Sequence, residues 1–564
     1  MSGLLEVEAA AGLAVYGARA VPGAVDARAR LVADRVPERL VARDPTLWGP
    51  QGENTAKTRL GWLDTFRRSR ELLPRLAELR DELQRMGFDH VVLAGIGGSA
   101  RAAEVITRTL DVDLTVLDTT DPHRVRAALG DRLDSSVVVV SSKSGDTIET
   151  DSVLRAYLKA FTDADLPGGT SRFVIVTDPG SPLATLADEI GANLFLADPD
   201  VGGRYSALTA FGLVPAALAG VDVAELLDQA EEFARSLADP DDNPALTLGA
   251  ALGAAALAGR DKTALVEDGT GIVGLGAWIE QLVAESTGKQ GRGILPVVIE
   301  SPGSPGTTGD DVLTVTVGGS LPPESVPGGG ITPHVAVNGP LGAQFLAWEY
   351  ATAVVGRLLD VDPFDEPNVA ESKENTRRVL ASGPPMENEA SGPPGGERGP
   401  ESSLPAFTDG PVEVYGTDLG HASTVDQALG WLLSRVPPGG YLAVLAFLDP
   451  VASADVATMR AALAKDSSHP VTFDWGPRYL HGCGQYHKGG PQTGAFVQIT
   501  GAVDDDLPVP DRPYTFGQLQ AAQAAGDREA LAARGRPLVR LHLTDRAAGV
   551  ARLLAAVDEL PWVS

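Results

Sequence analysis

Residues 136–147 read SVVVVSSKSGDT, a run of valines that gives way to hydroxyl side chains, a glycine and one lysine. A short apolar run of this kind is typical of a buried strand, and the TIETDSVL that overlaps its end is typical of a helix. The loop between them, SSKSGDT, could cap the helix or bind an anion, because hydroxyl groups serve both purposes. The neighbouring segments help to choose between these interpretations.

Strand and helix patterns alternate on both sides of this stretch. The expected strands are HVVLAG (90–95), DLTVLD (113–118), SSVVVVSS (135–142), RFVIVTD (172–178) and NLFLAD (193–198). Nearly continuous apolar strands separated by helices predict a parallel sheet that is covered by helices on both faces. We therefore expect a doubly wound α/β domain here.

Later segments also show alternating strand and helix patterns. Strands are expected at KTALVEDG, ILPVVIE and DVLTVTVGG, and a third α/β segment contains YLAVLAFL, AFVQIT and PLVRLHL. The fold class is therefore α/β, with two doubly wound domains of mainly parallel sheet and a C-terminal α/β segment. The predicted parts are an N-terminal extension (1–54), a first domain (55–230), a second domain (231–382), a flexible Pro- and Gly-rich linker (383–403) and the C-terminal segment with its tail (404–564).

Composition excludes several classes of protein. The chain has 564 residues and a formal net charge of −29, which disfavours binding to nucleic acid or anionic membranes. Cys483 is the single cysteine, so no intramolecular disulfide forms. No apolar stretch approaches ~20 residues without Gly, Pro or charge, so no membrane span is predicted. A cytoplasmic protein is expected.

A glycine-rich loop, AGIGGSA (94–100), follows the strand at 90–95. Its glycines allow a tight turn and a close approach of the backbone to a ligand, although a purely structural turn explains them as well. The loop lacks the full G-x-G-x-x-G spacing, and SSKSGDT lacks the Walker pattern. Because two such loops follow neighbouring strands, they meet at the carboxyl edge of the sheet, where a phosphate monoester fits.

Three further stretches carry residues suited to chemistry. VGGRYS (201–206) places Arg204 beside two glycines, and WIEQLVAESTGK (278–289) puts Gln281 and Glu285 one helical turn apart on one face. PFDEPNV (363–369) precedes Lys373. Each of these residues taken alone is also explained as an exposed surface charge or a turn residue.

Taken together, these stretches resemble the glucose-6-phosphate isomerase (phosphoglucose isomerase) family. GIGGS, SKSGDT, VGGRYS, Q-x-x-x-E-S-x-G-K and FD-x-P-x-V-x-x-x-K occur in the order of that family, over about residues 55–380. The resemblance implies two sugar-isomerase (SIS) domains. The C-terminal GPRYLHGCGQYHKGGPQTGAFVQIT resembles the isomerase half of bacterial transaldolase–isomerase fusions.

The resemblance also implies an activity, the reversible isomerisation of glucose 6-phosphate and fructose 6-phosphate in glycolysis and gluconeogenesis. Glu285 would move a proton between C2 and C1, Arg204 would stabilise the enediolate, and Lys373 would assist ring opening. The residues implied in substrate binding are Gly98, Ser99, Ser142, Lys143, Ser144, Thr147 and Gln281. This chemistry needs one carboxylate and one cation and no metal or redox cofactor, and a small sugar phosphate is the expected partner.

The sequence departs from the family at the lysine and at the ring-opening histidine. The family pattern has Gln, Gly and Glu where Glu366, Asn368 and Ala370 stand, which leaves the role of Lys373 open. The context of His334 does not match the family's histidine, which normally comes from the partner subunit. We therefore expect the loop LHGCGQYHKGG to supply this group, with His487 preferred as acid/base and His481 near the substrate. A histidine acting in cis leaves both a homodimer and a monomer open.

The sequence is compatible with other functions. A dual-specificity phosphoglucose/phosphomannose isomerase has the same requirements. A non-catalytic sugar-phosphate sensor needs the loops but not Glu285, Arg204 or Lys373. An amidotransferase isomerase half needs an N-terminal cysteine nucleophile, and Cys483 is far from that position.

Overall fold

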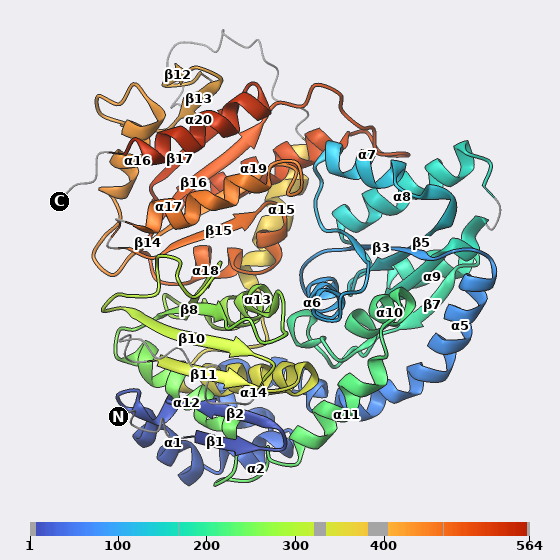
Figure 1. Cartoon of the computed structure of the whole chain (residues 1–564), viewed down its shortest axis with the longest axis vertical. Coiled ribbons are helices and arrows are strands. Elements are labelled where there is room, and N and C mark those ends of the chain that lie inside the picture. The colour runs from blue at the N-terminus through green and yellow to red at the C-terminus, as the bar shows by residue number, and fades with distance from the viewer. Residues whose placement is uncertain are drawn as a thin grey trace. The chain divides into compact units, whose positions relative to one another are not determined.

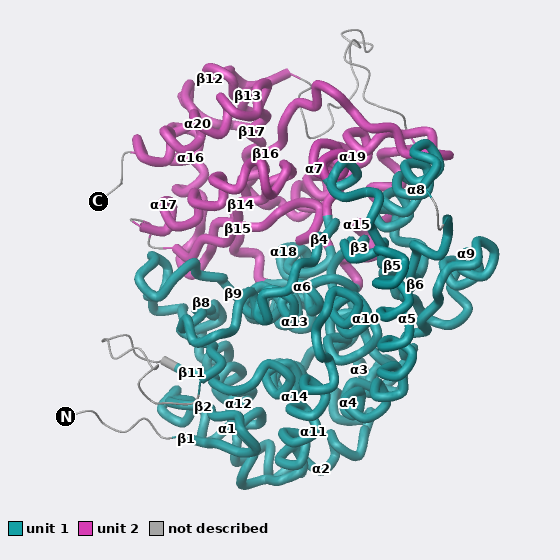
Figure 2. The backbone as a smooth tube through the Cα atoms, turned by 45° about the vertical axis from the view of Figure 1, so that its right-hand side comes forward, with its two compact units in different colours: residues 1–118, 128–366, 481–490 teal, residues 119–127, 367–480, 491–564 magenta. Residues whose placement is uncertain are grey.

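The computed structural model describes residues 7–166, 169–320, 334–381, 404–465, 467 and 469–560. The predicted linker at 383–403 lies outside these residues. The chain forms two compact units, coloured teal and magenta in Figure 2. Unit 1 comprises residues 1–118, 128–366 and 481–490, and unit 2 comprises residues 119–127, 367–480 and 491–564.

The first sheet of unit 1 is parallel throughout and has the strand order β4-β3-β5-β6-β7. Figure 1 labels its strands β3, β5 and β7. Its strands are β3 (His90–Gly95), β4 (Thr115–Leu117), β5 (Ser136–Ser141), β6 (Phe173–Thr177) and β7 (Asn193–Leu196). β3, β5 and β6 are buried along their whole length, as strands covered on both faces should be. The predicted doubly wound fold is confirmed.

The strand order reverses at β3, which has β4 on one side and β5 on the other. Gly95 lies opposite Ser141 in the register of β3 and β5, so the loops that follow these two strands begin side by side. Such a reversal is where open α/β sheets bind their ligands.

The second sheet of unit 1 has the order β1-β2-β11-β10-β8-β9. Its strands are β1 (Val7–Ala10), β2 (Leu13–Tyr16), β8 (Lys262–Glu267), β9 (Leu295–Ile299), β10 (Val312–Gly318) and β11 (His334–Asn338). β8 to β11 are parallel, and the hairpin β1–β2 adds an antiparallel edge next to β11. β8, β9 and β10 lie where the sequence predicts strands, whereas the hairpin and β11 were not predicted.

Helices supply the other layers of unit 1. They are α1 (Ala24–Ala33), α2 (Val36–Val41), α3 (Gly49–Ala56), α4 (Thr65–Arg68), α5 (Leu73–Arg85), α6 (Arg101–Thr109), α8 (Ile148–Asp163), α9 (Pro182–Ile190), α10 (Ala210–Ala219), α11 (Val223–Ala234), α12 (Pro244–Leu257), α13 (Leu275–Thr287), α14 (Leu341–Leu359) and α18 (Gly484–Gly489). α7 (Pro122–Gly130) spans the boundary of the units. α13, which carries Gln281 and Glu285, is almost entirely buried.

Unit 2 contains a six-stranded sheet with the order β12-β13-β17-β16-β14-β15. Its strands are β12 (Phe407–Asp409), β13 (Val412–Tyr415), β14 (Tyr441–Phe447), β15 (Val471–Trp475), β16 (Gly494–Gly501) and β17 (Leu538–Leu543). Its helices are α15 (Pro367–Ala381), α16 (Val425–Leu433), α17 (Met459–Lys465), α19 (Phe516–Ala532) and α20 (Arg546–Asp558). β14, β16 and β17 form parallel pairs, which confirms the predicted C-terminal α/β segment.

Within the described parts of the chain, no helix combines the length and the apolar character that crossing a bilayer requires.

Candidate active site

The glycine loop after β3 packs tightly against two other loops of unit 1. A Cβ atom added to Gly98 would lie 2.2 Å from the carbonyl oxygen of Gly203, and one added to Gly97 would lie 2.8 Å from Cβ of His481. Gly97 also has φ +65°, which favours glycine. The absence of side chains here lets the loop carrying Arg204 and the loop carrying His481 approach the end of β3.

The hydroxyl loop after β5 is held by its own side chains. Ser142 Oγ and Thr147 Oγ1 are 2.8 Å apart, and the Gly145 amide donates to Ser142 Oγ at 3.1 Å. Ser144 donates to Asp146, and Ser99 of the glycine loop donates to the carbonyl of Ile96. These hydrogen bonds fix the turns and leave the hydroxyl oxygens with further acceptor or donor capacity.

The helices that follow these two loops begin without a side-chain cap. In the described structure, neither Ala100 before α6 nor Thr147 before α8 forms a capping hydrogen bond through its side chain. The first amide groups of a helix have no partner inside the helix and attract anions. Two such helix starts at the reversal point of one sheet suit a bound phosphate group.

Lys143 adds a cation to this region, but it is already paired. Its Nζ lies 2.5 Å from Oδ2 of Asp178 and also donates to the carbonyl of Asp198 at 3.4 Å. Burial raises the pKa of Asp178, while the charge of Lys143 opposes the rise. A phosphate group at this loop would therefore compete with Asp178 for the lysine.

Glu285 and Arg204 form a buried ion pair. Arg204 Nη1 donates to Glu285 Oε1 at 2.9 Å, and the guanidinium also donates to Ser286 Oγ at 2.8 Å. Burial raises the pKa of Glu285 and Arg204 opposes the rise. Burial alone would lower the pKa of Arg204, but the nearby carboxylates outweigh it and raise that pKa. The pair thus places a carboxylate of increased proton affinity beside a permanent cation.

Gln281 links this pair to the C-terminal loop. Its Nε2 donates to Glu285 Oε2 at 3.3 Å and to the carbonyl of His481 at 2.8 Å. Its Oε1 is buried and has no hydrogen-bond partner among the described residues. An amide that touches the carboxylate and keeps an unused acceptor is suited to a sugar hydroxyl.

His481 pairs with a carboxylate that follows the hydroxyl loop. Its Nε2 lies 3.0 Å from Oε1 of Glu149, in the first turn of α8. The His481 side chain is 13% exposed, whereas His487, in α18, is 1% exposed as a residue. The structure therefore places His481 and Glu149 together and leaves His487 inside the protein.

These contacts form one connected network within unit 1. Starting from the hydroxyl loop, it passes through Glu149, His481, Gln281, Glu285 and Arg204. It ends at the glycine loop, because Ser206, two residues after Arg204, donates to the carbonyl of Gly98 at 3.2 Å. Residues from five separate stretches of sequence are thus connected, and no step of the network needs a residue of unit 2.

The segment 362–366 contacts both Arg204 and Lys289. Arg204 Nη2 donates to the carbonyl groups of Pro363 and Asp365 at 2.7 and 2.9 Å. Lys289 donates to the carbonyl of Asp362 and pairs with the Asp365 carboxylate at 2.5 Å. Burial, followed by the charge of Arg204, lowers the pKa of Lys289 to about 8.

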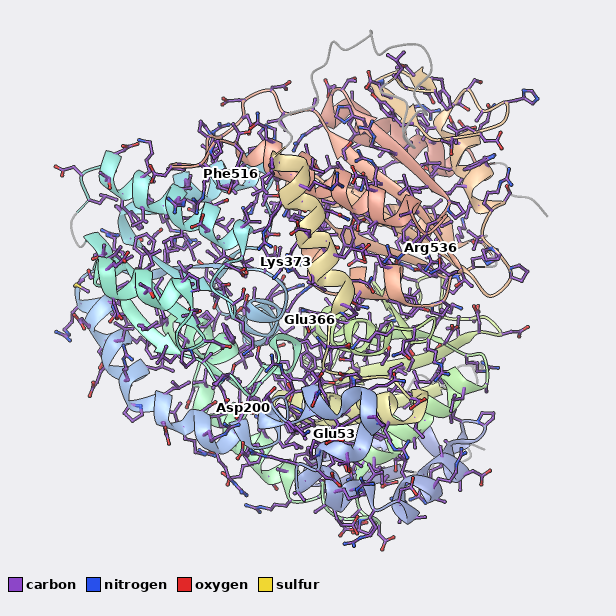
Figure 3. All side chains as sticks on the ribbon, turned by 180° about the vertical axis from the view of Figure 1, so that it is seen from behind. Glu53, Asp200, Glu366, Lys373, Phe516 and Arg536 are labelled. Atoms are coloured by element: carbon purple, nitrogen blue, oxygen red, sulfur yellow. The ribbon has the colours of Figure 1, made fainter. Side chains whose placement is uncertain are left out.

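Three of these residues were given no role from the sequence. Glu149 directly follows the hydroxyl loop, Lys289 ends the Q-x-x-x-E-S-x-G-K pattern, and Glu366 was noticed only as a departure from the family. Their positions next to the recognised motifs in the sequence were the signal that could have identified them as site residues. Lys373 lies on α15 in unit 2, where Figure 3 labels it, so its predicted role stays a prediction.

Comparison with known proteins identifies the family that this region resembles. Residues 84–296 match the family model described as phosphoglucose isomerase. A protein of Haloarcula marismortui named probable glucose-6-phosphate isomerase is 38% identical over 213 residues, covering 37% of this chain and 49% of that protein. A glucose-6-phosphate isomerase of Heliobacterium modesticaldum is 29% identical over 392 residues, covering 57% of this chain and 87% of that protein. The predicted resemblance is confirmed over the matched regions.

The chain spans about half the length of the first two curated relatives that it matches. Among solved structures, a hypothetical protein from Thermus thermophilus has a TM-score of 0.54 and 24% identity, covering 67% of this chain and 100% of that one. A glucose-6-phosphate isomerase from Chlamydia trachomatis has a TM-score of 0.53 and 18% identity, covering 67% and 90%. At these identities the likeness shows the fold alone. The further resemblance to fusion-type isomerases stays a prediction.

Proposed function

We propose that this protein is a glucose-6-phosphate isomerase, which interconverts glucose 6-phosphate and fructose 6-phosphate through an enediolate. The observation that carries the proposal is the buried Glu285–Arg204 pair, connected by hydrogen bonds to a loop suited to phosphate. The match of residues 84–296 to phosphoglucose isomerase supports the same activity.

In this proposal the phosphate group binds at the starts of α6 and α8, where backbone amides are free of side-chain caps. The glycine loop contributes Gly98 and Ser99, and the hydroxyl loop contributes Ser142, Lys143, Ser144 and Thr147. Holding the phosphate fixes the other end of the sugar relative to Glu285, so that binding energy is used to orient C1 and C2.

Glu285 then acts as the base. Its carboxylate takes the proton from C2 of the open-chain aldose and returns it to C1, while the proton of the C2 hydroxyl passes to the C1 oxygen, so that the aldehyde becomes a hydroxyl as the ketone forms. The raised pKa of Glu285 favours proton uptake. Arg204, fixed beside the carboxylate, stabilises the negative charge that develops on the enediolate oxygens. Gln281 orients the sugar through its unused Oε1.

Ring opening precedes this step and needs a group that can give and take a proton. We propose His481 for this role in preference to His487, because His481 is partly exposed and paired with Glu149. His481 would donate a proton to the ring oxygen as the C1–O5 bond breaks, and the C1 hydroxyl would lose its proton. A contribution of Lys373 to the same step is proposed from the family resemblance alone.

The proposed chemistry moves a proton within one substrate, so it requires no metal or redox cofactor. The proposal includes a cytoplasmic enzyme with a small sugar phosphate as partner and without nucleic-acid or membrane partners. Because His481 and Glu149 belong to the same unit of one chain, a monomer could complete this pair, and a homodimer stays open.

A turnover assay tests the proposal. The purified chain is incubated with fructose 6-phosphate, and glucose 6-phosphate is measured by a coupled dehydrogenase; mannose 6-phosphate serves as a second substrate. We expect interconversion by the native chain and a loss of about 10³-fold in Glu285→Gln. Tight binding of the sugar phosphate without any turnover would instead support a sensor and contradict the proposal.

A further inference from the structure

Arg204 contacts two carboxylates through the same nitrogen atom. Its Nη1 donates to Glu285 Oε1 at 2.9 Å and to Glu366 Oε2 at 3.0 Å. An Nη atom carries two hydrogens, so each carboxylate can accept one of them. The two side chains differ in exposure: that of Glu285 is 8% exposed and that of Glu366 is 50% exposed. Figure 3 labels Glu366, which directly precedes α15.

The backbone before Glu366 is held by two cations. Arg204 donates to the carbonyl groups of Pro363 and Asp365, and Lys289 contacts the carbonyl of Asp362 and the carboxylate of Asp365. A segment held by these contacts presents the next residue in a defined position. The contact of Glu366 with Arg204 is therefore built into the site, unlike an ion pair between two mobile surface side chains.

We propose that Glu366 is a positioning residue of the isomerase, which shares Arg204 with Glu285 and thereby keeps the base ready to take the proton from the sugar. The proposal rests on the proposed function, since it assigns a role to Glu366 in that reaction. With both carboxylates present, the single positive charge of Arg204 is divided between them. Without Glu366, Arg204 would neutralise Glu285 alone and make it a weaker base.

The pKa shift of Glu285 has the direction that the proposal requires. Because both oxygens contact one nitrogen, they lie less than about 6 Å apart, a distance at which like charges disfavour ionisation of each other. The pKa of Glu285 is raised first by burial and lowered by Arg204, and Glu366 adds to the rise. Lys289, two residues beyond the end of α13, lowers the pKa of Glu285, and the charge of Lys289 is partly offset by Asp365.

Other titratable groups belong to elements that pack against α13, and a substitution at position 366 leaves all of them unchanged. They are Arg101, Glu104 and Arg108 on α6, Lys262 and Glu267 on β8, Glu349 and Arg357 on α14, and His487 and Lys488 on α18. A difference between the native chain and a variant at position 366 therefore reports the charge of Glu366 itself.

The test is the pH profile of kcat/KM for fructose 6-phosphate in three variants. Glu366→Gln removes the charge and keeps the shape, Glu366→Asp keeps the charge, and Glu78→Gln removes an exposed carboxylate on α5 as the matched control. We expect Glu366→Gln to move the acidic limb down by about one pH unit, since the charge is close but half-exposed. Its plateau should fall about threefold, because a weaker base transfers the proton more slowly. In Glu366→Asp and Glu78→Gln, the acidic limb of the kcat/KM profile should stay at the pH of the native chain.

Two results would overturn the inference. An acidic limb that does not move in Glu366→Gln means that Glu366 does not act on the base. A loss as large as that of Glu285→Gln means that Glu366 is itself the base. If the native chain shows no turnover, the proposed function fails, and the inference is still tested by the infrared band of the protonated Glu285 carboxyl, identified by its loss in Glu285→Gln. The pH at which this band appears should fall by about one unit in Glu366→Gln, and an unchanged value contradicts the inference.

Discussion

Gly98→Ala is the substitution whose effect is best defined by the structure. The new Cβ would lie 2.2 Å from the carbonyl oxygen of Gly203 and 2.8 Å from the amide nitrogen of Arg204. Ordinary contacts need about 3.5 Å, so the loop carrying Arg204 must move by about 1 Å. A displacement of about 1 Å near reacting groups can reduce the rate about 100-fold, and overpacking costs about 1–3 kcal/mol of unfolding free energy.

The matched control is Gly203→Ala, because nothing lies within 4 Å of the Cβ position at Gly203. Steady-state kinetics give kcat for both variants, and denaturant unfolding gives their stability. We expect Gly98→Ala to lose about 100-fold in kcat and Gly203→Ala to stay within about threefold of the native chain. A Gly98→Ala enzyme with native kcat, or an equal loss in both variants, would refute the steric reasoning.

Substitutions at three other contacts give further tests. Asp178→Asn should free Lys143 from its 2.5 Å ion pair and lower KM about threefold at unchanged kcat; a higher KM would show that Asp178 holds the lysine in place. His481→Asn and Glu149→Gln should each slow turnover of the cyclic substrate about 10²-fold, and their double variant should lose no more than His481→Asn; additive losses in kcat would argue against a functional pair. Lys289→Gln tests the lowered lysine pKa, about 8 in the folded chain against 10.5 for the unperturbed group. Between these values the unfolded chain binds more protons, so the native unfolding free energy should rise with pH by up to roughly 3 kcal/mol relative to Lys289→Gln; parallel curves in denaturant titrations would contradict this.

The fold was predictable where periodicity is strong. The valine-rich strand at Ser136–Ser141 and its neighbours in the first sheet are buried on both faces, so their sequences are nearly all apolar. The hairpin β1–β2 was missed because its pairing with β11 joins segments more than 300 residues apart, which no local pattern records. β11 is a five-residue strand beside a Gly- and Pro-rich stretch.

Residues 60–86 show a helical pattern, but the structure breaks them into short turns and two helices, α4 and α5. Pro74 lies in the first turn of α5, where its missing amide hydrogen costs nothing, instead of kinking one long helix.

The site was predictable in its motifs and less so in its contacts. The spacing of Gln281 and Glu285 put both side chains on one helix face, and the structure joins them by a hydrogen bond. The pairing of His481 with Glu149 spans 332 positions of sequence and depends on how the C-terminal loop returns to unit 1. The sequence could suggest a histidine from this loop but not which one is exposed or paired.

The most direct test of the account is hydrogen exchange in heavy water, followed by proton NMR on fructose 6-phosphate and glucose 6-phosphate. The native chain should incorporate deuterium at C1 of the ketose and C2 of the aldose. Glu285→Gln should lose this exchange by about 10³-fold while binding a sugar-acid phosphate with nearly native affinity. Native exchange rates in Glu285→Gln would contradict the assignment of the base and, with it, the proposed mechanism.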